Sequence, residues 1–254
     1  MTATAAVLAG SRPEGDEFAA RLGAPMKALI PVAGRPMVAR PVEALLESGR
    51  FGRVIVLAQK TDDLARALPA DDRLSVRPSG ATIAATIAAL CGEPDLHWPL
   101  LVTTADHALL DAQMVGEVMD AASGCDIAIG VVERGNLLRR LPQTKRTWLK
   151  FRGGAFTGAN LFVLASPAVR PAIDLWRSVE QDRKKSWRLI SLAGPVVLLA
   201  AALRLLSIDD VLVRLGARLG IGIRAVRMSN PLAGVDVDKV ADHELAESIL
   251  EGRL

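Results

Sequence analysis

Short apolar runs that alternate with amphipathic segments most constrain how this chain of 254 residues can fold. The runs are bounded by turn residues, as expected of buried strands, and the segments between them repeat apolar residues at helical spacing. This alternation predicts an α/β fold: a Rossmann-like, three-layer sandwich whose central sheet is mostly parallel. The expected strands are 5–8, 53–57, 74–77, 99–103, 126–132, 148–151, 158–164 and 223–228; the expected helices are 37–48, 61–68, 81–90, 111–122, 168–177, 208–219 and 242–250.

The domain organisation is expected to be simple. With 50% hydrophobic residues, the chain can bury a full core. No linker separates two independently folding parts, so we expect one domain over residues 1–254. Residues 177–220 break the strand–helix alternation and are interpreted as a helical insertion within it.

Composition excludes several classes of protein. The 31 basic and 28 acidic residues leave a net charge of only +3, aromatic residues make up 4%, and Tyr is absent. Nucleic-acid binding, which needs a basic stripe and stacking aromatics, is therefore not expected. Cys91 and Cys125 form no CxxC pattern, so neither a disulfide framework nor a zinc site is indicated. The first residues lack a basic-then-apolar signal region, so we expect a cytoplasmic protein.

One apolar segment leaves two interpretations open. Residues 189–203 (LISLAGPVVLLAAAL) carry no charge and follow a basic stretch that contains Trp187. The segment is too short to span a bilayer, and Gly194 and Pro195 interrupt it. Residues 183–206 are expected either to touch the inner face of a membrane peripherally or to pack in the core or a homodimer interface.

A phosphate-binding loop is predicted directly after the first strand. Gly10, Ser11 and Arg12 follow that strand, and Lys27 comes one loop later. Successive backbone N–H groups in such a turn bind anions, and Arg12 and Lys27 add positive charge. The spacing matches neither a P-loop nor a dinucleotide-binding GxGxxG motif.

The arrangement resembles the MobA-like NTP transferases, nucleotidyltransferases of the GT-A fold type. Their pattern is a strand, L-A-G-G-x-G-x-R, a spacer and K-x-L-x-P-x-x-G-x-P. The second half is intact as 27–36 (KALIPVAGRP). The first half departs from it, because Ser11 replaces a Gly, Arg12 comes early and the spacer is long. The resemblance implies nucleotide contacts from Leu8, Ala9, Gly10, Ser11, Arg12 and Lys27.

A second nucleotide contact is expected at residues 79–82. Helix N-termini with Gly and hydroxyl residues bind anions or base edges. The resemblance implies that Ser79, Gly80 and Thr82 contact the nucleobase, and a plain helix cap is the alternative.

Asp106 is the first candidate metal ligand. It follows the apolar strand 99–103, at the carboxyl end where open α/β sheets place ligands. Mg²⁺ prefers carboxylate, water and phosphate oxygens. The resemblance implies that Asp106 binds the metal that bridges the triphosphate. His107 beside it is either a substrate contact or a structural histidine.

A second acidic motif follows the last strand. In 234–239 (GVDVDK), alternation places Asp236 and Asp238 on one face of an extended segment. Two such carboxylates are costly unless they are solvated, paired or bound to a cation. The resemblance implies that Asp236 is the second metal ligand, with Asp238 as the less favoured choice.

The acceptor site is expected at Gly158 and Asn160, by resemblance. Five cations lie between the central strands and this segment: Arg139, Arg140, Lys145, Arg146 and Lys150. They would either guide an anionic acceptor or form an ordinary solvated face.

The resemblance implies Mg²⁺-dependent transfer of an NMP from an NTP to a phosphorylated acceptor, with release of pyrophosphate. Arg12, Lys27 and Asp106 would be the catalytic residues, acting by positioning and charge neutralisation. A GT-A-type glycosyltransferase and a non-catalytic nucleotide-binding module remain the alternatives. The motif at 27–36 is typical of triphosphate users, which disfavours the glycosyltransferase.

Overall fold

The computed structural model describes residues 3–10, 16–181, 200 and 204–254. Its strands are β1 Ala3–Leu8, β2 Pro31–Val32, β3 Arg35–Pro36, β4 Phe51–Ala58, β5 Leu74–Pro78, β6 Leu100–Thr104, β7 Ile127–Glu133, β8 Leu149–Phe151, β9 Gly154–Leu164 and β10 Ile223–Arg227. Its α-helices are α1 Glu17–Arg21, α2 Ala39–Glu47, α3 Asp62–Ala67, α4 Ile83–Cys91, α5 Ala112–Ala121, α6 Arg134–Arg140, α7 Arg170–Gln181, α10 Ile208–Leu219 and α11 Val240–Leu250. Short 3₁₀ helices are η1 Lys27–Leu29, η2 Pro167–Val169 and η4 Pro231–Gly234.

One large sheet organises the described part of the chain. Its strand order is β10-β7-β9-β6-β1-β4-β5, and β8 pairs with β9. Neighbours pair in parallel, except that β9 is antiparallel to β6, β7 and β8. Leu8 at the end of β1 pairs with Leu57 of β4 and Thr104 of β6. The carboxyl ends of these strands therefore share one edge, where such sheets bind ligands.

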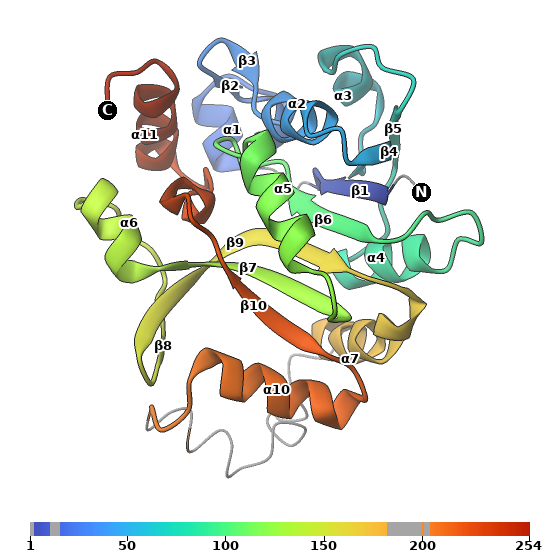
Figure 1. Ribbon diagram of the computed structural model, residues 1–254. Helices are drawn as coiled ribbons and strands as arrows, with labels where there is room; N and C mark the ends of the chain where they lie inside the picture. The colour runs from blue at the N-terminus through green and yellow to red at the C-terminus, as the bar shows by residue number, and fades with distance from the viewer. Residues whose placement is uncertain (1–2, 11–15, 182–199, 201–203) are drawn as a thin grey trace.

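Alternating side chains of the central strands enter two separate hydrophobic clusters. On β1, Ala5 and Val7 join one cluster with helices α2 and α5, whereas Ala6 joins another with α4 and α7. Figure 1 shows α5 crossing in front of the sheet and α4 and α7 on its other side. Strand periodicity thus produces the three layers. The expected mostly parallel α/β fold is confirmed.

Several elements of the structure were not expected from the sequence. The hairpin β2–β3, the short helix α1 and helix α6 were not expected, and β9 runs antiparallel within the parallel sheet. Each is short or set by its partners, so local periodicity carries little signal for it.

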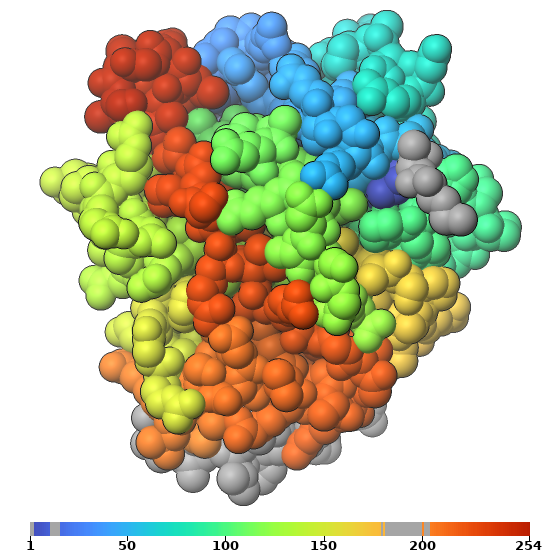
Figure 2. All heavy atoms as spheres, in the orientation of Figure 1, coloured from blue at the N-terminus to red at the C-terminus, as the bar shows by residue number. Residues whose placement is uncertain are grey.

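The C-terminal helix α11 packs against the N-terminal hairpin β2–β3. His243 Nε2 of α11 lies 2.6 Å from the Pro31 carbonyl oxygen, and the Ala33 N–H donates to Glu247 Oε1 at 3.1 Å. Figure 2 shows α11 against the N-terminal segments at one end of the molecule. This packing brings the second acidic motif to the sheet edge.

The apolar segment lies mostly outside the described residues. Of the insertion expected over 177–220, the structure describes the end of α7, Ala200 and residues from 204 onward, including α10. The contact expected from 183–206 concerns residues that are almost all undescribed. No helix in the described ranges is both long and apolar enough to cross a bilayer.

Candidate active site

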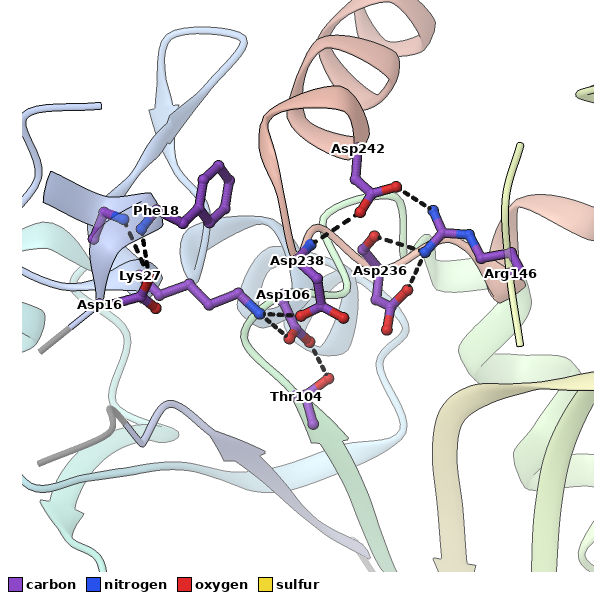
Figure 3. Close-up of polar contacts among 10 residues, drawn as sticks. Asp16, Phe18, Lys27, Thr104, Asp106, Arg146, Asp236, Asp238 and Asp242 are labelled. Atoms are coloured by element: carbon purple, nitrogen blue, oxygen red, sulfur yellow. Dashed lines mark hydrogen bonds and ion pairs between the residues drawn. The ribbon is translucent and has the colours of Figure 1, made fainter. Parts of the chain in front are cut away.

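Side chains from three distant parts of the chain meet at the carboxyl edge of the sheet. Asp106 follows β6, Asp236 and Asp238 follow η4, and Lys27 begins η1. The three carboxylates lie between Lys27 on one side and Arg146 on the other (Figure 3). The Val237 N–H donates to the Asp106 carbonyl oxygen at 3.0 Å, which joins the two acidic segments.

Residues 27–36 form the 3₁₀ helix η1, which begins at Lys27, and the hairpin β2–β3, which holds the end of that helix in place. Ala33 and Gly34 have φ angles of 46° and 75° in the two-residue turn between β2 and β3. Tight hairpins of this kind need positive φ at both turn positions, and glycine meets that need without strain. Arg40 Nη2 donates to the carbonyls of Val32 and Ala33 at 3.0 Å each. The Met37 N–H donates to the Ile30 carbonyl at 2.8 Å, so the hairpin fixes the end of η1.

Lys27 bridges the two acidic segments. Its Nζ lies 2.6 Å from Asp106 Oδ2 and 2.5 Å from Asp238 Oδ1. Burial opposes its charge, but these carboxylates outweigh burial and raise the pKa of Lys27. Burial likewise opposes ionisation of Asp238, but the Lys27 hydrogen bond prevails and lowers the pKa of that carboxyl. The Lys27 side chain stays 21% exposed, so an incoming anion can reach it.

Arg146 holds the acidic loop from the other side. Its Nη1 donates to the backbone oxygen of Asp236 at 3.1 Å and also pairs with the Asp236 carboxylate. Its Nη2 lies 3.1 Å from Asp242 Oδ1 at the start of α11. The sequence analysis offered two roles for Arg146: guiding an anionic acceptor or forming part of a solvated face. With only 7% of its side chain exposed, Arg146 has neither role. The run of basic residues at 139–150 gave no signal that Arg146 holds the acidic loop.

Gly234 lets the acidic loop pass close to the sheet. A Cβ at this position would lie 2.9 Å from Thr157 Cγ2 and 3.2 Å from Val132 Cβ. Real Cβ atoms do not approach that closely, so a larger residue would displace η4 from β7 and β9. The glycine of the GVDVDK motif therefore positions Asp236 by packing.

The cluster carries an excess of negative charge. Four carboxylates, those of Asp106, Asp236, Asp238 and Asp242, face two cations, Lys27 and Arg146. Burial, followed by the nearby charge of Asp238, raises the pKa of Asp236. Thr104 Oγ1 donates to Asp106 Oδ1 at 2.5 Å and so fixes that carboxylate. Within the described residues, no three His, Cys, Asp or Glu side chains form a ready-made metal site.

The predicted nucleotide loop is only partly described. Leu8 pairs with both neighbouring strands, and the Ala9 N–H donates to the Leu57 carbonyl at 2.9 Å. A Cβ on Gly10 would lie 3.2 Å from Gln59 Nε2, so the loop passes close to the end of β4. Ser11 and Arg12 lie outside the described residues.

Residues 79–82 form the entry to α4. The Ser79 N–H donates to the Ala58 carbonyl at 2.9 Å, which places this segment beside the end of β4. The Gly80 N–H donates to Thr86 Oγ1 at 3.0 Å, and Thr82 caps the helix by accepting from the Ala85 N–H at 3.2 Å. Both segments expected to contact the nucleotide thus lie next to the end of β4.

His107 lies in the interior. Its side chain is 1% exposed, and Nδ1 lies 3.5 Å from Thr103 Oγ1. Burial lowers the pKa of His107 to about 4, in spite of the charges of Asp106 and Asp111. The ring does not reach the surface, so the structure places it below the site as a packing residue.

Gly158 and Asn160 lie at an irregularity of β9. The β7–β9 register shifts between Ile129 and Val131, opposite these residues. Asn160 has a φ of 48°, a left-handed conformation that Asn tolerates better than most residues. Gly158 is exposed, whereas Asn160 is half-buried near the end of β6.

Comparisons with known proteins identify chains of similar fold. A structure from Thermus thermophilus described as a hypothetical transferase is 32% identical, with a TM-score of 0.80 over 96% of this chain and 100% of that one. The 2-C-methyl-D-erythritol 4-phosphate cytidylyltransferase of the same organism is 18% identical, with a TM-score of 0.55 over 99% and 100% of the two chains. The related synthase from Anaerococcus prevotii is 8% identical, with a TM-score of 0.59 over 98% and 99%.

The last two similarities show the fold alone. No curated protein matches the chain. A family model described as the MobA-like NTP transferase domain matches residues 5–196, which include Lys27 and Asp106. This chain therefore belongs to the MobA-like NTP transferase family.

Proposed function

We propose that this protein, acting as a single domain over residues 1–254, transfers an NMP from an NTP to a phosphorylated small-molecule acceptor and releases pyrophosphate. The observation that carries the proposal is the meeting of Lys27 with Asp106 and Asp238 at the carboxyl edge of β6. Family membership supports nucleotidyl transfer in general. The cluster supplies the charges that such a transfer needs.

The donor set of the cluster fits Mg²⁺. Asp106 and Asp236 would hold the ion, with Asp238 as the neighbouring alternative, because hard cations prefer carboxylate oxygens. The four carboxylates exceed the two cations by two negative charges, which one divalent cation would balance. When bound, Mg²⁺ would neutralise negative charge on the phosphates.

The remaining chemistry rests on positioning. An acceptor phosphate is already ionised at neutral pH, so its oxygen attacks the α-phosphorus without a general base. The bond to the bridging oxygen of the β-phosphate breaks, and pyrophosphate leaves. Lys27, which is exposed enough to exchange a carboxylate for a phosphate, would stabilise charge on the transferred and leaving groups together with Arg12.

Substrate contacts follow from the placement of the other segments. Backbone groups of Leu8, Ala9, Gly10 and Ser11 would line the phosphates, and Ser79, Gly80 and Thr82 would contact the base. Gly158 and Asn160 would face the acceptor, and Asn160 lies near the end of β6. The interior ring of His107 takes no part in this proposal.

Pyrophosphate release tests the proposal. We would measure it with Mg²⁺ for ATP, CTP, GTP and UTP, each with a panel of phosphorylated sugars, alditols, inositols and pterins. Release should require one NTP and one acceptor, and Asp106→Asn should lower kcat/KM by at least about 100-fold.

The matched control is Asp120→Asn, which alters an exposed carboxylate of α5 that pairs with Arg50, away from the cluster. It should keep wild-type activity. Nucleotide binding without release for any acceptor would contradict the proposal and favour a regulatory module. Release of a sugar from a nucleotide-sugar would favour the glycosyltransferase alternative.

A further inference from the structure

An apolar groove opens from the candidate active site on the α4 and α7 side of the sheet. It has a volume of about 440 Å³, within the range of small-molecule sites. Its floor is β6 and β9, and its walls carry Ile83 and Ile87 of α4 and Ile173 and Trp176 of α7. No charged side chain lines it among the described residues.

Large hydrophobic side chains gather at this groove although they are exposed. Ile83, Phe162 and Trp176 are 46%, 37% and 41% exposed, and all three line it. Among the described residues, only eight large hydrophobic side chains are exposed to this degree. An exposed apolar patch of this kind marks a binding surface.

The groove is apolar over almost all of its lining, and its few polar groups lie at one end. Thr104 and Asn160 line it near the carboxyl edge of the sheet, as does Leu8, which pairs with Thr104. Leu164 lines the far part and pairs with Leu100, four residues before Thr104. At the rise of a β-strand this distance is about 13 Å. The polar end therefore faces the active site, and the rest is hydrocarbon.

Thr104 connects the groove to the cluster. The residue lines the groove, and its hydroxyl donates to Asp106 Oδ1 at 2.5 Å. A ligand in the groove thus ends next to Asp106, which we propose would hold Mg²⁺. A ligand that matches both parts has an anionic head and an aliphatic tail.

We infer that the acceptor is a phosphate monoester with an aliphatic chain, whose phosphate lies at Asp106 and whose chain occupies the groove. This inference rests on the proposed function and specifies its acceptor class. An oxygen of the acceptor phosphate forms the new bond to the α-phosphorus of the NTP, and pyrophosphate leaves. The product is a nucleoside diphosphate linked to the aliphatic group.

Chain length provides the first test. Binding of ethyl phosphate and octyl phosphate to the full chain is measured by calorimetry with Mg²⁺ and without NTP. Each buried methylene strengthens binding roughly three- to fourfold, so octyl phosphate should bind at least about tenfold more tightly even if only two of its six additional methylenes are buried. Equal affinities would overturn the inference.

Two groove variants and a matched control test whether the preference for octyl phosphate arises in the groove. Phe162→Asp and Trp176→Ala should each reduce the octyl-to-ethyl affinity ratio at least about threefold, since each removes part of the apolar wall. Alanine suits helix α7, so Trp176→Ala keeps the test valid if Phe162→Asp fails to fold. Val213→Asp changes a side chain of α10 that is 63% exposed and does not line the groove. It should leave the ratio unchanged; a loss of the ratio in Val213→Asp alone would overturn the inference.

Pyrophosphate release separates this inference from the proposed function. The ratio of kcat/KM between octyl and ethyl phosphate should follow the affinity ratio in all three variants. Release with sugar phosphates and no preference for the octyl chain would overturn this inference and leave the proposed function standing. Chain-dependent binding without release for any NTP or acceptor would overturn both.

Discussion

Lys27 and Arg146 flank the same acidic cluster, yet they are held in different ways (Figure 3). Lys27 reaches two carboxylates with a single ammonium group and remains 21% exposed. Arg146 is 7% exposed, and its planar guanidinium spans Asp236 and Asp242 with both terminal nitrogens. The two cations therefore have different accessibility to solvent and to ligands.

This difference indicates which charge serves the ligand and which serves the fold. A lysine ammonium on a flexible stem can exchange partners, whereas an arginine fork in a buried site is preorganised for the carboxylates it holds. Removing Lys27 should mainly affect catalysis, and removing Arg146 should mainly affect stability. The first two predictions below test that separation, and the third concerns a neutral group beside the same cluster.

Lys27→Met is expected to cause the largest effect. Loss of a charge that stabilises the transferred phosphate should lower kcat/KM for pyrophosphate release about 100- to 1,000-fold. Its ion pairs are partly exposed, so the free energy of unfolding should change by less than about 1 kcal/mol. Arg66→Met, which breaks an exposed pair with Asp63, is the control and should change neither quantity. Near-normal turnover of Lys27→Met would remove the distinction between the two cations.

Arg146→Met is expected to destabilise the fold by about 3 kcal/mol, because it leaves the buried Asp242 carboxylate without its cation. Urea denaturation at neutral pH measures this change. Adding Asp242→Asn should recover part of the loss, since the unpaired charge is then gone. Arg152→Met, which breaks an exposed pair with Asp210, should cost far less. A loss no larger than in that control would show that Arg146 does not hold the acidic loop.

His107 sharpens the comparison, because this ring lies beside the cluster yet is held neutral by burial. Its pKa is lowered to about 4 in the folded chain, against an ordinary value of 6.5. As the pH falls below 6.5, the unfolded chain takes up a proton that the folded chain does not, so stability decreases. Between pH 7 and pH 5 the loss should be about 1–2 kcal/mol.

Urea denaturation at the two pH values measures this loss. His107→Gln should show a smaller decrease between pH 7 and pH 5 than the wild-type chain. His97→Gln, at an exposed position, is the control and should retain the wild-type decrease. Identical pH dependence in His107→Gln and the wild-type chain would contradict the prediction.

The fold was largely predictable because its signals are local. The apolar run 53–57 lies within β4, and the run 99–103 overlaps β6 from its first residue, Leu100. The alternation of such runs with helices predicted the layered sheet. The antiparallel direction of β9 was not predictable in this way, because it depends on pairing with β6 and β7. Helix α6 is short and mostly polar, so its periodicity carried little information.

The candidate site was predictable in part. Asp106, Asp236 and Lys27 followed from motifs, but no motif indicated that Arg146 holds the acidic loop. Asp238 was the less favoured ligand, yet the structure pairs it directly with Lys27. The exposed apolar residues of the groove come from separate elements, so their gathering has no signature in any one segment.

By itself, the sequence determined the family, the layered α/β fold and the candidate residues Lys27, Asp106 and Asp236. Strand and helix periods and the 27–36 motif are patterns of nearby residues, so the sequence shows them directly. Only the tertiary structure decided which charges meet. Lys27 and Asp238 are 211 residues apart, and Arg146 and Asp242 are 96 residues apart. Such pairings form only after the strands align at one sheet edge and α11 folds back onto the N-terminal hairpin, since a charge interacts strongly only with partners a few ångströms away.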